Sequence, residues 1–251
     1  YVHANKRSLV NQREVGRHTE SFASALRAAL REDPDVILVG EMRDLETTQL
    51  VLEAAESGHL VLATVHTSGG AAAIDRLVDQ FAGERQAQVR TALAESLRGV
   101  VAQILVRRRT GGLVAALEVL LATSAVSNLI REGKSYQISS ILQTGRGAGM
   151  TTLNDSLLEL VQQGLVTAEA ALHKAPQRAE FRQALERIVE DGVAAGEFRA
   201  VAPGDLALAV MGILEGCNER QLHPAFQPIG VEGLHRLVNL LFDGAANAPG
   251  M

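Results

Sequence analysis

The chain has 251 residues, 47% of them apolar, and a formal net charge of −5, so it is long enough for one large domain or two small ones. The acidic balance argues against nucleic acid or an anionic membrane surface as a partner. Cys217 is the only cysteine, which excludes an intrachain disulfide and favours a reducing compartment. No apolar run approaches the roughly 20 residues that cross a bilayer.

The first part of the chain alternates predicted strands and helices. Ser8–Val15 is predicted to be a strand, and Thr19 is predicted to cap the helix that follows. The apolar residues of that helix, at spacings of i, i+4, i+7 and i+8, are Phe22, Leu26, Ala29 and Leu30. Asp33-Pro34-Asp35 ends the helix, because the residue before proline avoids helical conformation. Val36–Val39 is apolar throughout, as expected for a strand buried on both faces of a parallel sheet.

Two more strands joined by a Gly111-Gly112 turn follow further along, and helices dominate from Thr123 onward. The predicted strands are Leu60–Val65, Val100–Arg107 and Leu113–Leu121. The remaining predicted helices are Glu46–Ser57, Ala71–Gln80, Glu84–Leu97, Ser124–Arg131, Tyr136–Gln143, Leu153–Gln163, Ala168–His173, Arg178–Ala195, Pro203–Leu214 and Val231–Phe242. This order predicts an α/β fold: a partial parallel core over residues 1–122 with a hairpin at its edge, helices over 123–173, and an all-helical region over 174–251.

A carboxylate directly follows the first apolar strand. Gly40-Glu41 places Glu41 at the carboxyl edge of the sheet, where open α/β folds bind ligands. A carboxylate there can orient or deprotonate the water that attacks a phosphoryl group, and Gly40 keeps the edge uncrowded. From the residues alone, a buried strand followed by an ordinary charged loop stays an open alternative.

Two histidines flank the next predicted strand. His59 precedes it and His66 follows it, with Thr67 beside the second histidine. Because the carboxyl ends of parallel strands meet at one edge, His66 is expected near Glu41, where it or Thr67 could bond a terminal phosphate oxygen. A purely structural histidine is the alternative, and the presence of Glu41 on the neighbouring strand favours a site.

Several segments, in this order and spacing, resemble the PilT-type retraction motors of type IV pili, which are secretion-type ATPases with a RecA-like core. The segments that carry the resemblance are Arg13–Arg27, Arg31–Asp35, Gly40–Thr47, Gly58–Val61, Ala125–Glu132, Gln143–Gly145 and Gly149–Leu153. Together they cover residues 1 to about 173. Ala125–Glu132 is similar to a helix that these motors require for retraction rather than for nucleotide binding.

The resemblance implies a role for particular residues. Glu41 matches the catalytic Walker B glutamate, and His59 and His66 match the histidine box, with His66 the better candidate for sensing the terminal phosphate. The residues expected to bind nucleotide are His66, His59, Gly40, Arg43 and Thr67. The residues expected to form the effector helix are Ala125, Asn128, Leu129, Ile130, Arg131 and Glu132.

The same resemblance implies cofactors, partners and a location. For the intact family it predicts ATP with Mg²⁺, a homo-hexamer, and an inner-membrane platform protein of the pilus as partner, and we expect this chain alone not to bind the nucleotide and the ion tightly. It predicts no nucleic acid partner and no dedicated metal-binding residues. The expected location is the cytoplasm, at the inner face of the cytoplasmic membrane.

The chain departs from the family pattern at its phosphate-binding side. No Gly-x-x-x-x-Gly-Lys-Ser/Thr loop occurs in it, and that loop normally cradles the phosphates and helps to hold magnesium. Val2–Lys6 matches a stretch that follows the family's acidic box, whose acidic residues would fall before Tyr1. We therefore expect a chain that begins inside a larger gene product, carries about half of the site, and does not turn over ATP by itself.

The end of the chain resembles a different family. Arg178–Arg182, Gly192–Arg199, Leu208–Gly212 and Leu234–Gly244 look like the carboxyl-terminal ligand and dimerisation domain of TetR-family repressors. The DNA-binding helix-turn-helix of that family is absent, so the resemblance does not imply DNA binding. The alternative function is accordingly a non-enzymatic ligand-binding or dimerisation module attached to a motor remnant, and an ordinary helical appendage is also compatible with the pattern.

Overall fold

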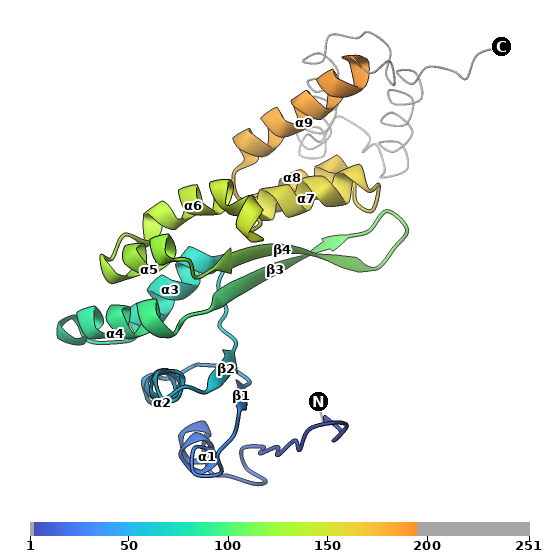
Figure 1. Cartoon of the computed structure of the whole chain (residues 1–251). Helices are drawn as coiled ribbons and strands as arrows, with labels where there is room; N and C mark the ends of the chain where they lie inside the picture. The colour runs from blue at the N-terminus through green and yellow to red at the C-terminus, as the bar shows by residue number, and fades with distance from the viewer. Residues whose placement is uncertain (1–2, 195–251) are drawn as a thin grey trace, which may run out of the picture. The chain divides into compact units, whose positions relative to one another are not determined.

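The computed structural model describes residues 3–194, which fall into two compact units. Among these residues, the first unit is built from residues 3–104 and 117–152, and the second from residues 105–116 and 153–194. The α-helices of the described residues are α1 (Phe22–Ala29), α2 (Leu45–Glu56), α3 (Gly70–Asp79), α4 (Gly83–Ser96), α5 (Ser124–Arg131), α6 (Ile138–Thr144), α7 (Leu153–Gln162), α8 (Ala168–Lys174) and α9 (Arg178–Ala194) (Figure 1). The strands are β1 (Val36–Val39), β2 (Leu60–Ala63), β3 (Gly99–Arg107) and β4 (Leu113–Leu121).

Most predicted elements are present with boundaries shifted by a residue or two. The helix expected over Tyr136–Gln143 is divided into a short 3₁₀ turn, Ser135–Gln137, and α6. The helices expected over Pro203–Leu214 and Val231–Phe242 lie outside the described residues. The α/β class is confirmed, while the domain boundaries after residues 122 and 173 stay predictions.

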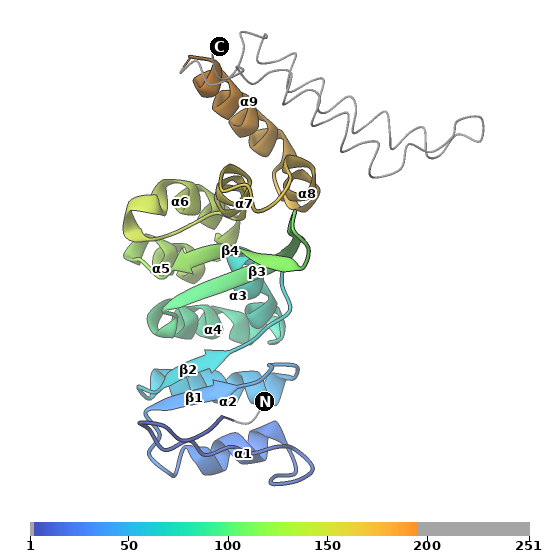
Figure 2. The same cartoon turned by 90° about the vertical axis from the view of Figure 1, so that its right-hand side faces the viewer.

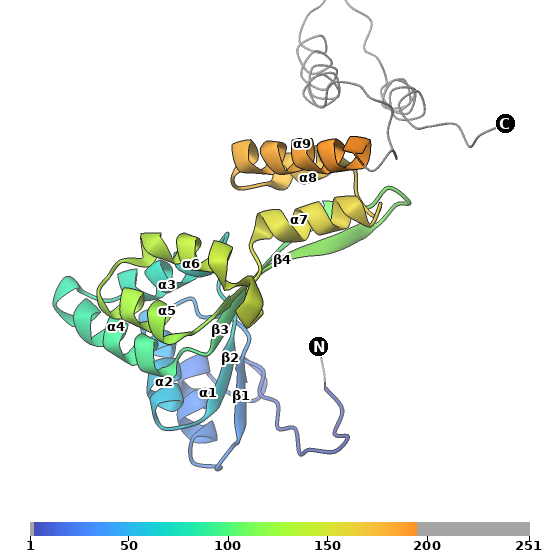
Figure 3. The same ribbon diagram turned by 45° about the horizontal axis from the view of Figure 1, so that its top comes forward.

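Strands β1 and β2 form a parallel pair, with Val36 opposite Leu60 and Val39 opposite Ala63 (Figure 2). Helices α1 and α2 lie on the same side of this pair (Figures 1 and 3). Ile37 and Val39 are buried, but Leu38 is 62% exposed. The expectation that this strand is buried on both faces is therefore wrong for the described structure, because helices cover only one face.

The glycine turn joins β3 and β4 as predicted, and Gly111 and Gly112 both have positive φ, which favours glycine. Arg108 N–H donates to the Gly112 carbonyl across this turn. The two strands form a sheet of their own and are not bonded to β1 or β2. The hairpin was expected at the edge of the parallel core, and within residues 3–194 it is instead a separate two-stranded sheet.

The predicted strand over Ser8–Val15 is wrong. This segment belongs to no strand: its single bridge joins Val15 to Thr19, and Leu9 is 89% exposed. Arg13 donates from Nη1 to the Ala25 carbonyl of α1 at 3.2 Å and forms an ion pair with Glu32, which follows that helix. A strand needs a neighbouring strand to pair its backbone groups. Here side chains accept some of these bonds instead: Val10 N–H donates to Asn5 Oδ1 and Glu14 N–H donates to His18 Nδ1.

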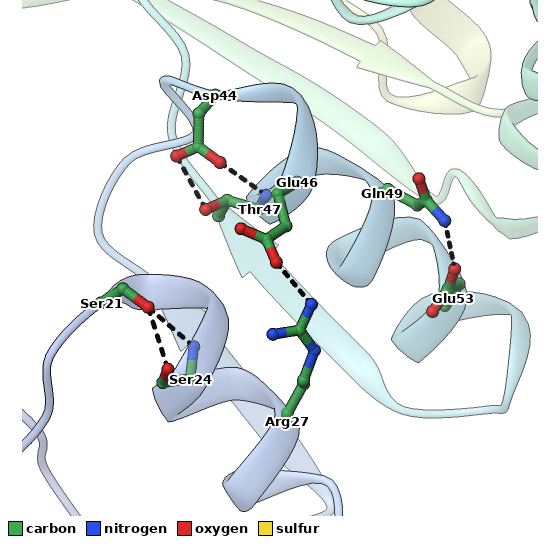
Figure 4. Close-up of polar contacts among 8 residues, drawn as sticks. All are labelled: Ser21, Ser24, Arg27, Asp44, Glu46, Thr47, Gln49 and Glu53. Atoms are coloured by element: carbon green, nitrogen blue, oxygen red, sulfur yellow. Dashed lines mark hydrogen bonds and ion pairs between the residues drawn. The ribbon is translucent and has the colours of Figure 1, made fainter.

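The helix starts show which polar residues act as caps (Figure 4). Ser21, and not the expected Thr19, caps α1 by accepting a bond from Ser24 N–H, whereas Thr19 donates its hydroxyl to the Ser21 carbonyl. Asp44 caps α2 by accepting bonds from Thr47 N–H at 2.8 Å and from the Thr47 hydroxyl at 2.9 Å. A side-chain acceptor at this position satisfies an otherwise unpaired amide of the first turn.

The core of the first unit is a single apolar cluster that joins the strands to the helices. Its fully buried members come from widely separated elements, and they include Ala54, Leu120, Val126, Ile130 and Ile138. In the second unit, α7, α8 and α9 pack together, and the Phe181 ring is completely buried (Figure 3). Among residues 3–194, no helix is long and apolar enough to cross a membrane.

Candidate functional site

The carboxyl ends of β1 and β2 hold the residues singled out in the sequence. Beyond the last ladder pair, Met42 N–H donates to the Thr64 carbonyl at 3.1 Å, and the Thr64 hydroxyl donates to the Gly40 carbonyl. These bonds extend the pairing of the two chains past the strands. They hold the segment after β1, which contains Glu41, alongside the segment after β2, which contains His66.

Glu41 is the centre of a three-residue cluster. Its Oε1 lies 3.0 Å from His66 Nε2, and its Oε2 lies 2.7 Å from Arg43 Nη2. The Glu41 side chain is 22% exposed, whereas those of His66 and Arg43 are 75% and 76% exposed. The carboxylate is therefore half-buried at the edge, and its two partners reach it from the solvent side.

The charges in this cluster favour an ionised carboxylate. The hydrogen bond from Arg43 is the main cause that lowers the pKa of Glu41 below its usual 4.5, and the charge and hydrogen bond of His66 lower it further. The pKa of Arg43 is raised by the same carboxylate. Exposed ion pairs of this kind are weak, so both partners can leave Glu41 at little cost when a ligand competes for them.

The remaining predicted residues are divided between this edge and the opposite end of β2. His59 lies at the amino end of β2, where its Nδ1 is 3.1 Å from the Ala54 carbonyl and 2.9 Å from Ser57 Oγ. The structure does not bring it to Glu41, and its role in nucleotide binding stays a prediction. Thr67 lies next to His66 and donates its hydroxyl to the Gly69 carbonyl at 3.5 Å. A side chain at Gly40 would meet no atom within 4 Å, so the edge beside Glu41 is open.

Two residues that the sequence analysis did not single out hold the loop that carries His66. Arg76 of α3 donates from Nη1 to the His66 carbonyl at 2.8 Å. Glu118 of β4 accepts a bond from Gly70 N–H at 2.7 Å, at the first residue of α3. The Gly69-Gly70 pair is the only local signal of this close approach, and nothing in the sequence identifies Glu118 as its partner.

The predicted effector helix corresponds to α5 and its cap. Its inner side is apolar, with Val126 and Ile130 fully buried. Its outer side is polar, and there Arg131 Nη1 donates to Asn128 Oδ1 at 3.0 Å. The other predicted residues divide in the same way: Leu129 packs against the core, while Ala125 and Glu132 are exposed. The helix can therefore present a polar strip without disturbing its packing.

The residues at the edge fit a phosphate better than they fit a metal. His66 and Arg43 supply nitrogen donors, and Thr67 supplies a hydroxyl, all of which suit phosphate oxygens. Among residues 3–194 there is no group of three or more His, Cys, Asp or Glu side chains that could hold a metal ion. Mg²⁺ prefers several oxygen ligands, and we assign no step to it.

Comparison with known proteins shows the family of the chain. Residues 5–197 match the family of type II/IV secretion system proteins. Because that match covers more than half of the chain, the chain belongs to this family. The match extends past residue 173, where the sequence predicted a boundary.

Two relatives and one solved structure illustrate the similarity. A twitching motility protein of Neisseria gonorrhoeae is 56% identical over 176 residues, which are 70% of this chain and 47% of the relative. The type IV pilus retraction ATPase PilT of Pseudomonas aeruginosa is 55% identical over 175 residues, 70% of this chain and 51% of the relative. A crystal structure of the pilus retraction motor PilT with bound ADP superposes with a TM-score of 0.66 at 50% identity, covering 72% of this chain and 51% of that one. The chain thus spans about half the length of these relatives.

Proposed function

We propose that this chain is the Walker B and histidine-box part of a type IV pilus retraction ATPase with a RecA-like core, and that Glu41 is its catalytic carboxylate. The observation that carries the proposal is the cluster of Glu41, His66 and Arg43 at the carboxyl ends of two parallel strands. The more than 50% identity to a retraction ATPase over 175 residues supports it. The whole motor would act as a homo-hexamer against a membrane platform protein.

The geometry indicates how the cluster would act in ATP hydrolysis. Glu41 is ionised, so it can accept a proton from water as the water oxygen forms a bond to the terminal phosphorus. The bond from that phosphorus to the bridging oxygen breaks, and ADP carries away the electron pair. His66 and Arg43 can turn from Glu41 to the terminal phosphate oxygens, because both side chains are about three-quarters exposed. Binding of the phosphate would thereby free the carboxylate for the water.

The test joins residues 1–173 to the amino-terminal half of a retraction motor, which supplies the phosphate-binding loop. ATP hydrolysis is expected in this chimera. Glu41→Gln keeps the shape of the side chain but removes the basic oxygen, so we expect nucleotide binding to survive while turnover falls about 10²–10⁴-fold. Steady-state phosphate release and nucleotide titration measure the two quantities.

The matched control in the chimera is Arg131→Ala on α5, which is expected to leave hydrolysis nearly unchanged because its side chain is on the exposed side of that helix. Turnover by Glu41→Gln at the parent rate would show that Glu41 is not the catalytic carboxylate. Asp44 is the next carboxylate along the chain, but its two oxygens bond Thr47 as a helix cap.

For the end of the chain, the sequence resemblance to TetR-type repressors supports a helical dimerisation module, of which α9 is the described part. We expect the segment from Pro176 to Met251 to sediment by itself as a dimer. A monomer at roughly tens of micromolar would refute this module.

A further inference from the structure

We infer that Glu118 is a positioning residue for His66: its carboxylate on β4 holds the start of α3, and through it the loop that presents His66 to Glu41. The inference deepens the proposed function and rests on it, because it assigns a purpose to a side chain that does not touch the Glu41 cluster. Residues 64–69 form this loop, between the end of β2 and the start of α3.

The His66 loop is held at both ends and in its middle. At the strand end, the Thr64 carbonyl accepts from Met42 N–H, and the Thr64 hydroxyl bonds the Gly40 carbonyl. In the middle, Arg76 bonds the His66 carbonyl. At the helix end, Glu118 bonds Gly70 N–H at 2.7 Å. Glu118 is the one of these side chains that comes from outside the β1–β2–α3 segment.

Glu118 replaces a local helix cap. The N-cap residue of α3 is Gly69, which has no side chain to accept a bond from the first turn. Glu118, 48 residues away in sequence, supplies the missing acceptor, and its negative charge suits the positive end of the helix dipole. Without the Glu118 carboxylate, the N–H of the buried Gly70 would lose this acceptor, and an unpaired buried N–H destabilises the fold.

The contact between α3 and β4 is too close for other residues at the helix start. A Cβ added to Gly69 would lie 3.0 Å from Glu118 Oε1, and one added to Gly70 would lie 2.9 Å from Leu120 Cδ2. Neither glycine has a positive φ, so close approach rather than backbone strain explains both of them. The two glycines thus allow the carboxylate to reach the backbone directly.

The position of the His66 loop matters because the hydrogen bond between His66 and Glu41 forms only over a short distance. Its 3.0 Å length lies within the normal range, and a displacement of about 1 Å would break it. A loop released at its helix end would let His66 leave Glu41. The pKa of Glu41 reports such a change, because the charge and the hydrogen bond of His66 both help to lower it.

The experiment follows the Glu41 carboxyl by NMR titration in the full chain without nucleotide. In Glu118→Ala we expect the Glu41 pKa to rise toward its ordinary value, because His66 is no longer held beside it. Removing a distant negative charge would have the opposite effect and lower that pKa, so the sign separates positioning from direct electrostatics. Glu118→Gln keeps an oxygen that can accept from Gly70 N–H, so we expect the pKa of Glu41 not to rise in this variant.

Glu132→Ala is the matched control, since it removes a carboxylate that pairs with Lys134 beyond α5. An unchanged or lowered Glu41 pKa in Glu118→Ala, or an equal rise in Glu118→Gln, would overturn the inference. Should Glu118→Ala fail to fold, Glu118→Asp keeps the charge but shortens the side chain, and the same rise is expected. The titration needs no hydrolysis, so a chimera without ATPase activity would refute the proposed function and leave this test standing.

Discussion

At the scale of single residues, Glu41 is defined by its two partners rather than by burial. Its carboxylate bonds Arg43 and His66, and both partners are largely exposed. Their attraction lowers its pKa, and Arg43 makes the largest contribution. The carboxylate is therefore ionised at neutral pH and its partners are easily rearranged, which suits the proposed role of Glu41 as the group that accepts a proton from water.

The lowered pKa predicts how stability depends on pH. The interaction stabilises the folded chain above pH 4.5, the ordinary value of an unperturbed Glu41, and is lost as the pH falls through the lower pKa of the folded state. Arg43→Ala should therefore reduce the free energy of unfolding at neutral pH, and the deficit should shrink toward zero as the solution is acidified below 4.5. Urea unfolding over a pH series measures the deficit.

The control for this prediction is the Arg43→Ala change in a Glu41→Gln background, where no pH-dependent deficit is expected because the titrating carboxyl is gone. A deficit that grew on acidification in the original background would contradict the assigned sign.

At the scale of elements, caps and cross-helix bonds explain how the edge is supported. Asp44 caps α2 through Thr47, and Arg27 of α1 reaches Glu46 of α2 at 2.5 Å (Figure 4). Thr48, fully buried in α2, donates its hydroxyl to Gln80 Oε1 at 2.8 Å. These bonds fix the helix that begins directly after the Glu41 loop.

Replacing the α2 cap should destabilise the chain measurably. Asp44→Ala removes the acceptor for Thr47 N–H and for the Thr47 hydroxyl, so we expect a loss of about 1 kcal/mol in the free energy of unfolding. Glu53→Ala, on the exposed part of the same helix, is the control and should change stability by less than about 0.5 kcal/mol. Equal effects of the two changes in urea titrations would mean that Asp44 is not a cap of energetic consequence.

At the scale of the whole molecule, the β1–β2 pair has one covered and one uncovered face. The exposed side chains are paired across the two strands, Val36 with Leu60 and Leu38 with Leu62, and each is between 48% and 62% exposed. Parallel sheets are normally covered on both faces, and a two-stranded sheet is marginal by itself. The relatives, of which this chain spans about half, contain additional chain length with which to cover such a face.

This face predicts self-association of the isolated chain. Replacing Leu38 and Leu62 together by Thr introduces β-branched, strand-compatible side chains and reduces the apolar surface. We expect the double variant to scatter less light than the parent at equal concentration, with the β1–β2 pairing retained. The control is Leu113→Thr, a single exposed leucine of the hairpin. Scattering that is the same for parent and double variant would show that this face does not drive association.

Local pattern was sufficient for a large part of this protein. Apolar spacing located α5 at its observed bounds and α2, α3, α4 and α7 to within a residue or so, and the Gly111-Gly112 pair located the hairpin turn. The Glu41 and His66 positions at one sheet edge also followed from sequence, because parallel strands carry their carboxyl ends in the same direction. The strand predicted over Ser8–Val15 required a neighbouring strand, which local pattern does not specify, and this prediction was wrong.

The sequence by itself determined most of the described elements, their order, and the two strand ends that carry the candidate site. Helix and strand periods and turn residues act over a few positions, so they can be read locally. Tertiary structure alone decided which face of β1 is covered, that the hairpin forms its own sheet, and that Arg43 completes the Glu41 cluster. It alone also paired Glu118 with Gly70. These features depend on contacts between separate elements, and a local period in the sequence does not specify which distant side chain will contact a given residue.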